Sequence, residues 1–172
     1  MRTPTLLVVA LLLSACQSTT GYRYPTGPTP VPVLTTVTLN QEVHIRPDYA
    51  SVYIQSGQVR LTNTAAEYHP HCILELRTLS PTTRTLQPDT FTVTGIRRER
   101  FMTRLGGLML AQATAFGGDY NPVMSTTVIS LHSDRQPDVL RLSCQQLDEP
   151  FRAHHVSMAE MQQALGDVMT LR

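Results

Sequence analysis

Residues 127–144 read TVISLHSDRQPDVLRLSC and carry the pattern on which the fold prediction depends. Thr, Val, Ile and Leu dominate 127–131 and 139–144, and the stretch between them is polar with Asp and Pro. Short β-favouring runs separated by such residues are typical of successive strands. We therefore expect both segments to be strands of one antiparallel sheet.

The same pattern recurs toward the N-terminus. In 72–77, Cys and two Leu residues alternate with Ile, Glu and Arg, and 90–94 alternates in the same way. This period of two is what an antiparallel sheet with one solvated face requires. Further strands are expected at 35–39, 43–45, 51–55 and 59–61, with Asn40-Gln41 forming a tight turn between the first two. The whole set predicts a single antiparallel β-sandwich or small barrel-like domain over 33–172.

The last part of the chain has a helical period instead. Ser157 and Glu160 match a capping box, in which the cap and the third helical residue bond reciprocally. Met158, Met161, Leu165 and Val168 follow at helical spacing. We expect one C-terminal α-helix, from about 158 to 169, that lies across the sheet and contributes its apolar stripe to the core.

Composition excludes several classes of protein. The 172 residues carry 14 basic and 13 acidic side chains, and 41% of them are hydrophobic. This apolar content can form a core, so the chain is not wholly disordered. A net charge of +1 argues against a general nucleic-acid binder. Every basic residue other than His is Arg, so lysine Schiff-base and P-loop chemistry are excluded.

Residues 1–15 have the parts of a secretory signal peptide. Arg2 supplies a positive start, 6–13 is the apolar run LLVVALLL, and small residues precede Cys16. The apolar run is too short to span a bilayer. An ordinary secretory signal with an incidental cysteine is the alternative interpretation.

The segment Leu13-Ser14-Ala15-Cys16 resembles the lipobox of bacterial lipoproteins. The resemblance implies cleavage before Cys16, which then carries acyl chains such as palmitate and anchors the protein in a membrane. Gln17 stands where enterobacterial-type lipoproteins of the inner membrane have Asp, so the resemblance implies the outer membrane, with the domain facing the periplasm. Residues 17–32 are rich in Thr, Gly and Pro, and 16–32 is therefore predicted to be a lipidated, flexible tether.

Two cysteines remain when Cys16 is set apart. Cys72 and Cys144 form an even pair in an oxidising compartment, and both lie in predicted strands. We predict a disulfide between them. Two buried free thiols, or one thiolate that ligates a metal, are the alternatives.

His69 and His71 are the densest pair of ligand-type residues. In an extended segment both imidazoles point to one side, so they could bind Zn²⁺ or Cu²⁺. No other cofactor is expected. A further ligand would have to come from His44, His132 or the pair at 154–155. The alternative is a solvent-facing loop before a strand.

One run of the sequence is basic. Arg97, Arg98, Arg100 and Arg104 could bind an anionic polymer, because arginine forks match phosphate and carboxylate groups. On a strand, however, Arg98 and Arg100 share one face while Arg97 and Glu99 share the other. The alternative is a solvated strand end whose charges discourage aggregation.

Residues 105–121 contain an apolar stretch between two Gly-Gly pairs. Leu108, Met109, Leu110 and Phe116 could form a flap that touches a partner protein or lipid. A short helix that plugs the open end of the sheet is the alternative.

No enzyme motif is present in the sequence. Asp148-Glu149 is the only adjacent acidic pair, and its place before Pro150 is typical of a turn. The segments around His71-Cys72 and 88–91, together with the terminal helix, look like uncharacterised proteobacterial lipoproteins, which implies no activity. We therefore expect a non-catalytic binding or assembly accessory of the cell envelope, with an envelope protein as partner. A periplasmic metal-binding module centred on His69 and His71, and a hydrolase of envelope polymers, are the alternatives.

Overall fold

The computed structural model describes residues 33–60, 64–102 and 122–172 of the chain. Most of this part is strand, every strand pair is antiparallel, and one helix lies near the C-terminus, which confirms the predicted fold class. The elements are β1 (Thr36–Leu39), β2 (Val43–Ile45), β3 (Ser51–Gln55), β4 (Gln58–Arg60), β5 (His71–Leu76), β6 (Arg84–Leu86), β7 (Asp89–Met102), β8 (Val123–His132), β9 (Val139–Asp148), α1 (Met158–Leu165) and β10 (Met169–Leu171).

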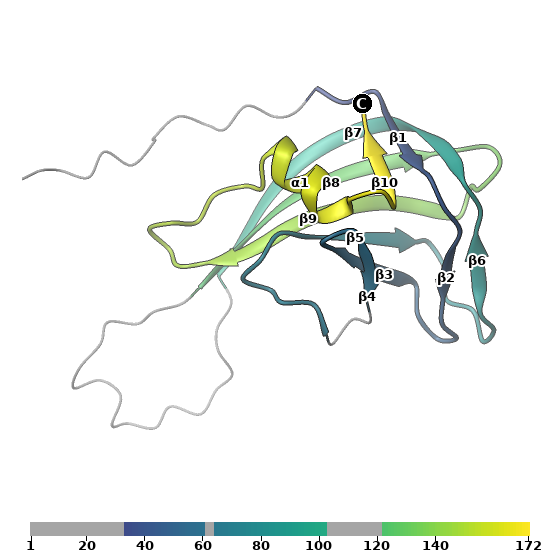
Figure 1. The fold of residues 1–172 in the computed structure, drawn as a ribbon, viewed down its shortest axis with the longest axis horizontal. Coiled ribbons are helices and arrows are strands. Elements are labelled where there is room, and N and C mark those ends of the chain that lie inside the picture. Colours follow the sequence, from purple (N-terminus) through teal and green to yellow (C-terminus); the bar gives the residue numbers. More distant parts are fainter. Residues whose placement is uncertain (1–32, 61–63, 103–121) are drawn as a thin grey trace, which may run out of the picture.

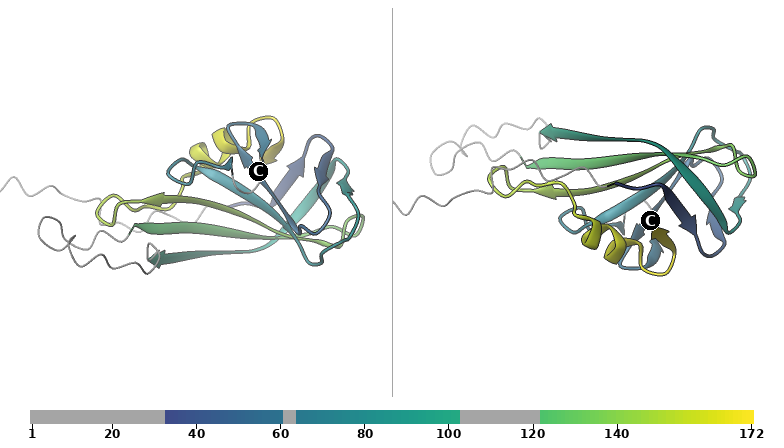
Figure 2. Two further views of the ribbon diagram at one scale, coloured as in Figure 1. Left: turned by 90° about the horizontal axis from the view of Figure 1, so that it is seen from below. Right: turned by 90° about the horizontal axis from the view of Figure 1, so that it is seen from above.

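Eight strands form one sheet in the order β10-β1-β7-β8-β9-β5-β3-β4, and β2 pairs with β6 in a separate ribbon. The large sheet curls into a half-barrel, and α1 lies over its inner face (Figures 1 and 2). Two irregularities in register, at 93–95 of β7 and at 75–76 of β5, occur within the curl. Such bulges increase the local twist of a strand, and they therefore help the sheet to bend around its core.

The core lies between the inner face and α1. Ile129, Leu142, Leu74 and Val52 lie side by side across β8, β9, β5 and β3, and all four are buried. The helix packs against β3, β5 and β10 and buries Met161, Ala164 and Leu165. Alternation along each strand thus places one apolar row against the helix and leaves the other row on the outer face.

The helix begins as predicted and ends earlier than predicted. Ser157 caps it, with the Ser157 hydroxyl accepting from the Glu160 backbone N–H and the Glu160 carboxylate accepting from the Ser157 backbone N–H. Gly166, with φ +53°, ends the helix, so the prediction of a helix as far as 169 is wrong. Val168 is buried outside the helix, and Met169 begins β10, which pairs with β1. The helical spacing of apolar residues suggested a longer helix because Val168 and Met169, which lie beyond the end of α1, are also buried in the core.

Asn40-Gln41 does not close a hairpin. The strand after it, β2, pairs with β6 and not with β1. Asn40 instead donates its backbone N–H to the Val168 carbonyl at 2.9 Å and its side-chain amide to Asp167 O and Thr170 Oγ1. The predicted tight turn is therefore wrong, and this segment ties the C-terminal region to the sheet.

Three strands are much longer than predicted. The expected strands 90–94, 127–131 and 139–144 are the inner parts of β7, β8 and β9, which extend to Met102, back to Val123 and on to Asp148. Their outer parts, residues 95–102, 123–128 and 144–148, form a three-stranded projection that we call the arm (Figure 1).

The predicted disulfide is confirmed. Cys72 of β5 and Cys144 of β9 lie directly opposite each other, with their Cα atoms 4.0 Å apart, and are bridged. Both residues are completely buried.

The predicted signal peptide, the predicted tether with Cys16, Arg104 and the segment 105–121 lie outside the described residues. The proposals that depend on them, the flap with Leu108, Met109, Leu110 and Phe116 included, stay predictions. Among the residues described, no helix has the length and apolar character needed to cross a membrane.

Candidate functional site

The arm has an open edge. β1 pairs with β7 only over Asp89–Thr92, and the Val93 backbone N–H donates to the Thr35 carbonyl at 2.9 Å. Beyond Val93, the strand pairs with β8 as far as Met102, and no other strand of the described ranges lies along its second edge. Backbone N–H and C=O groups on such an edge can pair with an added strand.

The outer face of the arm contains a shallow hollow of about 170 Å³. Side chains from β5, β7, β8 and β9 line it, because outward-facing positions of neighbouring strands lie side by side. The lining residues are Ile73, Glu75, Glu99, Phe101, Met124, Thr126, Val128, Arg141, Ser143 and Gln145. The hollow therefore combines an apolar floor with polar and charged groups.

One side of this hollow is fixed by a charged pair. Arg141 donates to the two Glu75 carboxylate oxygens at 2.9 and 2.7 Å, and Ser143 donates to the same carboxylate at 2.8 Å. These hydrogen bonds raise the pKa of Arg141 against the effect of its partial burial. The negative charge of Glu75 is thus paired with Arg141, and its carboxylate is held in place as part of the wall.

His71 is structural in this arrangement. Its ring is completely buried and stacks on Tyr53, with the ring centroids 5.9 Å apart. Nδ1 lies 3.0 Å from the His69 carbonyl oxygen, to which it can donate, and Nε2 lies 3.2 Å from Gln145 Nε2, from which it can accept.

The structure does not bring His69 and His71 together as a ligand pair. His69 is exposed, whereas both nitrogens of the buried His71 have protein partners. Across 33–60, 64–102 and 122–172, no group of three His, Cys, Asp or Glu side chains could hold a metal ion. The geometry gives the metal-binding alternative no support.

The basic run is divided between two faces. Arg97 forms an ion pair with Glu99, which lies on the outer face and lines the hollow. Arg98 and Arg100 lie on the inner face, where Arg100 Nη2 is 3.4 Å from the Ala153 carbonyl oxygen. The alternation expected for a strand thus holds, and the described arginines do not form one patch.

The inner face of the arm carries two arginines, Arg98 and Arg100, close to each other. Burial, followed by the charge of Arg100, lowers the pKa of Arg98. Burial and the two arginines also lower the pKa of His155 to about 4, so that this ring is neutral at physiological pH. Ser125 and Thr127 complete the region with buried hydroxyl groups that have no hydrogen-bond partner among the described residues.

The end of β7 presents two large apolar side chains to solvent. Phe101 is 54% exposed and Met102 is 77% exposed. The sequence pattern does not point to either residue, because both follow the basic run and do not continue an obvious strand. The signal that could have identified them is the period of two that runs from Arg97 through Glu99 to Phe101.

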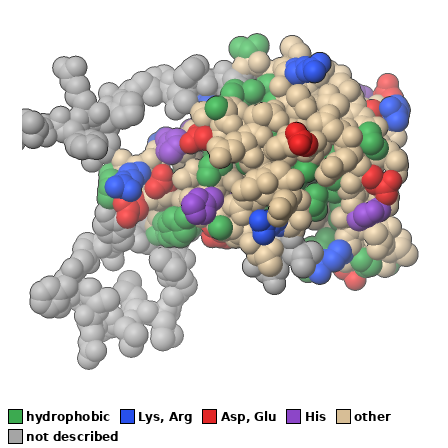
Figure 3. Space-filling view, viewed as in Figure 1, with side chains coloured by type: hydrophobic (Ala, Val, Ile, Leu, Met, Phe, Trp, Pro, Cys, Tyr) green, Lys and Arg blue, Asp and Glu red, His purple; other side chains and the backbone are tan. Residues whose placement is uncertain are grey.

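No family model, curated protein or solved structure matches this chain. Its function is therefore inferred from the arm and from the rest of the described surface. Over the face seen in Figure 3, acidic and basic side chains are interspersed, so no single-sign field covers it.

The acidic pair Asp148-Glu149 does not form a catalytic dyad. The Glu149 backbone N–H donates to the Asp148 carboxylate at 2.9 Å, as in a turn. The Asp148 carboxylate also lies 3.6 Å from His154 Nδ1, and that of Glu149 lies 3.8 Å from Arg152 Nε. Each carboxylate thus has a local partner, as the turn interpretation requires.

Proposed function

We propose that this protein is an outer-membrane lipoprotein, anchored through Cys16, whose periplasmic domain is a non-catalytic binding and assembly accessory. Its site is the arm, and its ligand is an extended, acidic segment of another envelope protein. The observation that carries the proposal is the open edge of β7 beyond Val93.

The chemistry of the edge indicates the character of the partner. A strand added to an open edge gains main-chain hydrogen bonds, while side chains on either face supply specificity. Three arginines and one glutamate occupy 97–100 of this strand. An acidic partner would complement the arginines of this segment.

Apolar contacts extend the same surface. Phe101 and Met102 are exposed at the end of the strand, and Phe101 lines the outer hollow with Met124 and Val128. Aromatic residues and Met are enriched at the centres of protein interfaces. A partner strand along β7 would place alternate side chains against this hollow and cover the exposed ring.

The anchor and the disulfide support the envelope location. The Cys72–Cys144 bridge is expected of an exported protein, because such bonds persist in oxidising compartments. The lipobox resemblance at residues 13–16 supplies the membrane attachment, since several acyl chains on one residue give stable anchoring.

Site-specific photo-crosslinking in living cells tests the proposal. We expect benzoylphenylalanine at position 101 to give one discrete adduct with an envelope protein, and the same group at Leu79, an exposed residue between β5 and β6, to give none. Charge reversal by Arg97→Glu and Arg100→Glu should abolish the adduct. Adducts that are identical at both positions, or that survive charge reversal, would refute the proposed arm interface.

Membrane fractionation tests the anchor separately. Cys16→Ser should release the protein from the outer-membrane fraction into the soluble periplasmic fraction, because the acylated residue is lost. Unchanged fractionation of this variant would contradict lipid attachment at Cys16.

A further inference from the structure

A second hollow, of about 100 Å³, lies between β2 and the β3–β4 hairpin. We call it the basic hollow. Ile45 and Val52, both buried, contribute its apolar part. Its other lining residues are His44, Arg46, Tyr49, Ser51, Val59 and Arg60, so three basic side chains and no carboxylate line it.

In the described part of the chain, the two arginines of the basic hollow have no carboxylate partner. Elsewhere, Arg84, Arg97 and Arg141 each form an ion pair with an Asp or Glu. Within the described residues, Arg46 and Arg60 form no ion pair. One lining residue does contact a carboxylate: His44 Nε2 lies 3.2 Å from Glu42 Oε1. Two guanidinium groups that form no ion pair with a described residue therefore line the same hollow.

Arg60 also has a buried donor without an acceptor. Its Nε atom is inaccessible to solvent and has no hydrogen-bond partner among the described residues. A buried donor that is left unpaired costs free energy, so such groups in a folded protein call for an explanation. An anion in the adjacent hollow would stabilise the charge of the Arg60 guanidinium, although the inaccessible Nε itself stays out of its reach.

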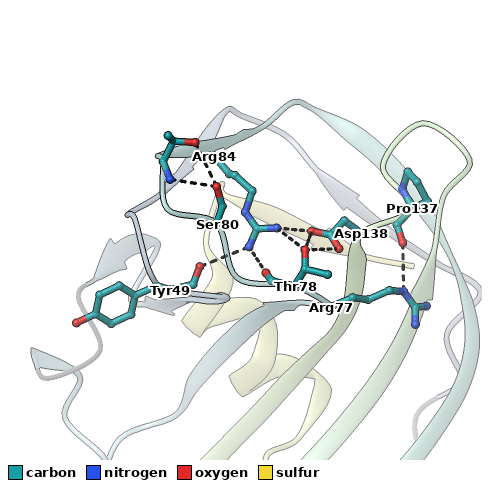
Figure 4. A network of polar contacts seen from close by, with 8 residues as sticks. Tyr49, Arg77, Thr78, Ser80, Arg84, Pro137 and Asp138 are labelled. Atoms are coloured by element: carbon teal, nitrogen blue, oxygen red, sulfur yellow. Dashed lines mark hydrogen bonds and ion pairs between the residues drawn. The ribbon is translucent and has the colours of Figure 1, made fainter.

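The opposite wall is held in place before any ligand binds. The Arg46 guanidinium lies over the Tyr49 ring, 4.6 Å from its centroid, and the Tyr49 backbone N–H donates to the Arg46 carbonyl at 3.3 Å. The Tyr49 carbonyl in turn accepts from Arg84 Nη2 at 3.4 Å, and Arg84 is held by Asp138 and Thr78. Figure 4 shows this network with the Tyr49 ring pointing away from it. Preorganisation of this kind lowers the cost of binding.

We propose that the basic hollow binds a phosphate group, with Arg46 and Arg60 as its ligands. Guanidinium forks match the oxygens of phosphate, and two positive charges favour an anionic group. The volume of about 100 Å³ is that of a few water molecules, and a phosphate group fits within it. Ser51 adds a hydroxyl group to the lining. The site is separate from the arm, and it belongs either to a phospholipid headgroup or to a soluble phosphate ester.

Calorimetric titration of the full chain in neutral maltoside micelles tests this proposal. The probes are inorganic phosphate, glycerol 3-phosphate and a monomeric short-chain phosphatidylglycerol. We expect saturable binding to one site that weakens at least tenfold in Arg46→Gln/Arg60→Gln. Arg60→Lys should weaken it severalfold, because the charge stays and the fork is lost. Arg152→Gln, which removes one exposed charge elsewhere, should leave binding unchanged.

The three probes distinguish the source of the phosphate. Binding of the lipid alone assigns the site to a headgroup, and binding of the two soluble probes assigns it to a free phosphate compound. Absence of binding by all three, or an equal loss in Arg152→Gln and in the double variant, would overturn the proposal.

A measurement on the unaltered protein avoids any dependence on variant folding. Phenylglyoxal modifies accessible arginines, and mass spectrometry locates the modified residues. The probe that binds should protect Arg46 and Arg60 and leave Arg152 reactive. Equal reactivity of all three arginines at saturating probe would contradict binding in the basic hollow.

Discussion

Removal of the Cys72–Cys144 disulfide should cost the domain a large part of its stability. The bridge joins two adjacent strands but spans 72 positions of sequence. Chain entropy for a closed loop of this length gives about 4 kcal/mol, because the unfolded chain without the bridge gains conformations that the native state does not share. Both sulfurs are completely buried, so Cys72→Ala/Cys144→Ala also leaves a small cavity, which adds roughly 1 kcal/mol.

Equilibrium unfolding in urea, followed by far-ultraviolet circular dichroism because the chain has no Trp, measures this loss. We expect the double variant to be about 5 kcal/mol less stable than the oxidised protein. The reduced wild type should be about 4 kcal/mol less stable, since it retains both sulfurs. Cys16→Ala should not change the free energy of unfolding, because Cys16 precedes the predicted domain.

A loss of less than about 1 kcal/mol in the double variant would contradict a large entropic contribution of the bridge. Such a result would mean that β5 and β9 stay close together in the unfolded chain, so that the bridge removes little entropy. A second check uses burial. Since both sulfurs are inaccessible, dithiothreitol should reduce the bridge much faster in denaturant than in buffer.

Three further predictions concern the C-terminal region. Between pH 7.5 and 5 the protein should lose about 2 kcal/mol of unfolding free energy. In the unfolded chain, His155 binds a proton near pH 6.5. In the native protein its pKa is about 4, so the same ring binds a proton only in stronger acid. His155→Gln should flatten this slope in urea titrations at several pH values, and an unchanged slope would contradict the assignment. Ser157→Ala should cost about 1 kcal/mol through loss of the capping box, measured by thermal unfolding, and a loss near zero would mean that the cap contributes nothing. Gly166→Ala should cost roughly 2 kcal/mol or more, because its Cβ would lie 2.5 Å from Gly57 Cα and the backbone there has φ +53°. Gly95→Ala is the control: its Cβ would meet no atom within 4 Å, so the free energy of unfolding should change little in the same measurement.

The inner parts of the long strands could be predicted because their inward and outward residues differ in polarity. In 72–77 the alternation of Leu with Glu and Arg matches the observed burial of β5. The arm could not be predicted in this way. Its residues 123–128 include Ser and Thr side chains that are buried, and its residues 97–100 are charged, so neither strand shows a clean apolar face. Neighbouring strands bury these polar residues, and only the folded sheet shows that they do.

The candidate sites show the same division. The alternation of Arg97 and Glu99 against Arg98 and Arg100 was readable from a strand period of two, and it correctly separated them into two faces. The basic hollow was not readable, because Arg46 and Arg60 are distant from each other in sequence. Both line the same hollow because β2 pairs with β6 in a separate ribbon and not with β1. No local sequence pattern indicates this pairing.

The sequence by itself determined the fold class, the start of the helix and the pairing of Cys72 with Cys144. These features depend on local periodicity, on local hydrogen bonding and on the number of cysteines left to pair. Only the tertiary structure decided where the helix ends and, within the described residues, which edge of the sheet has no neighbouring strand and which arginines form no ion pair. Each of these depends on contacts between residues far apart in the chain, and the energy of such contacts is set by the neighbours that folding brings together.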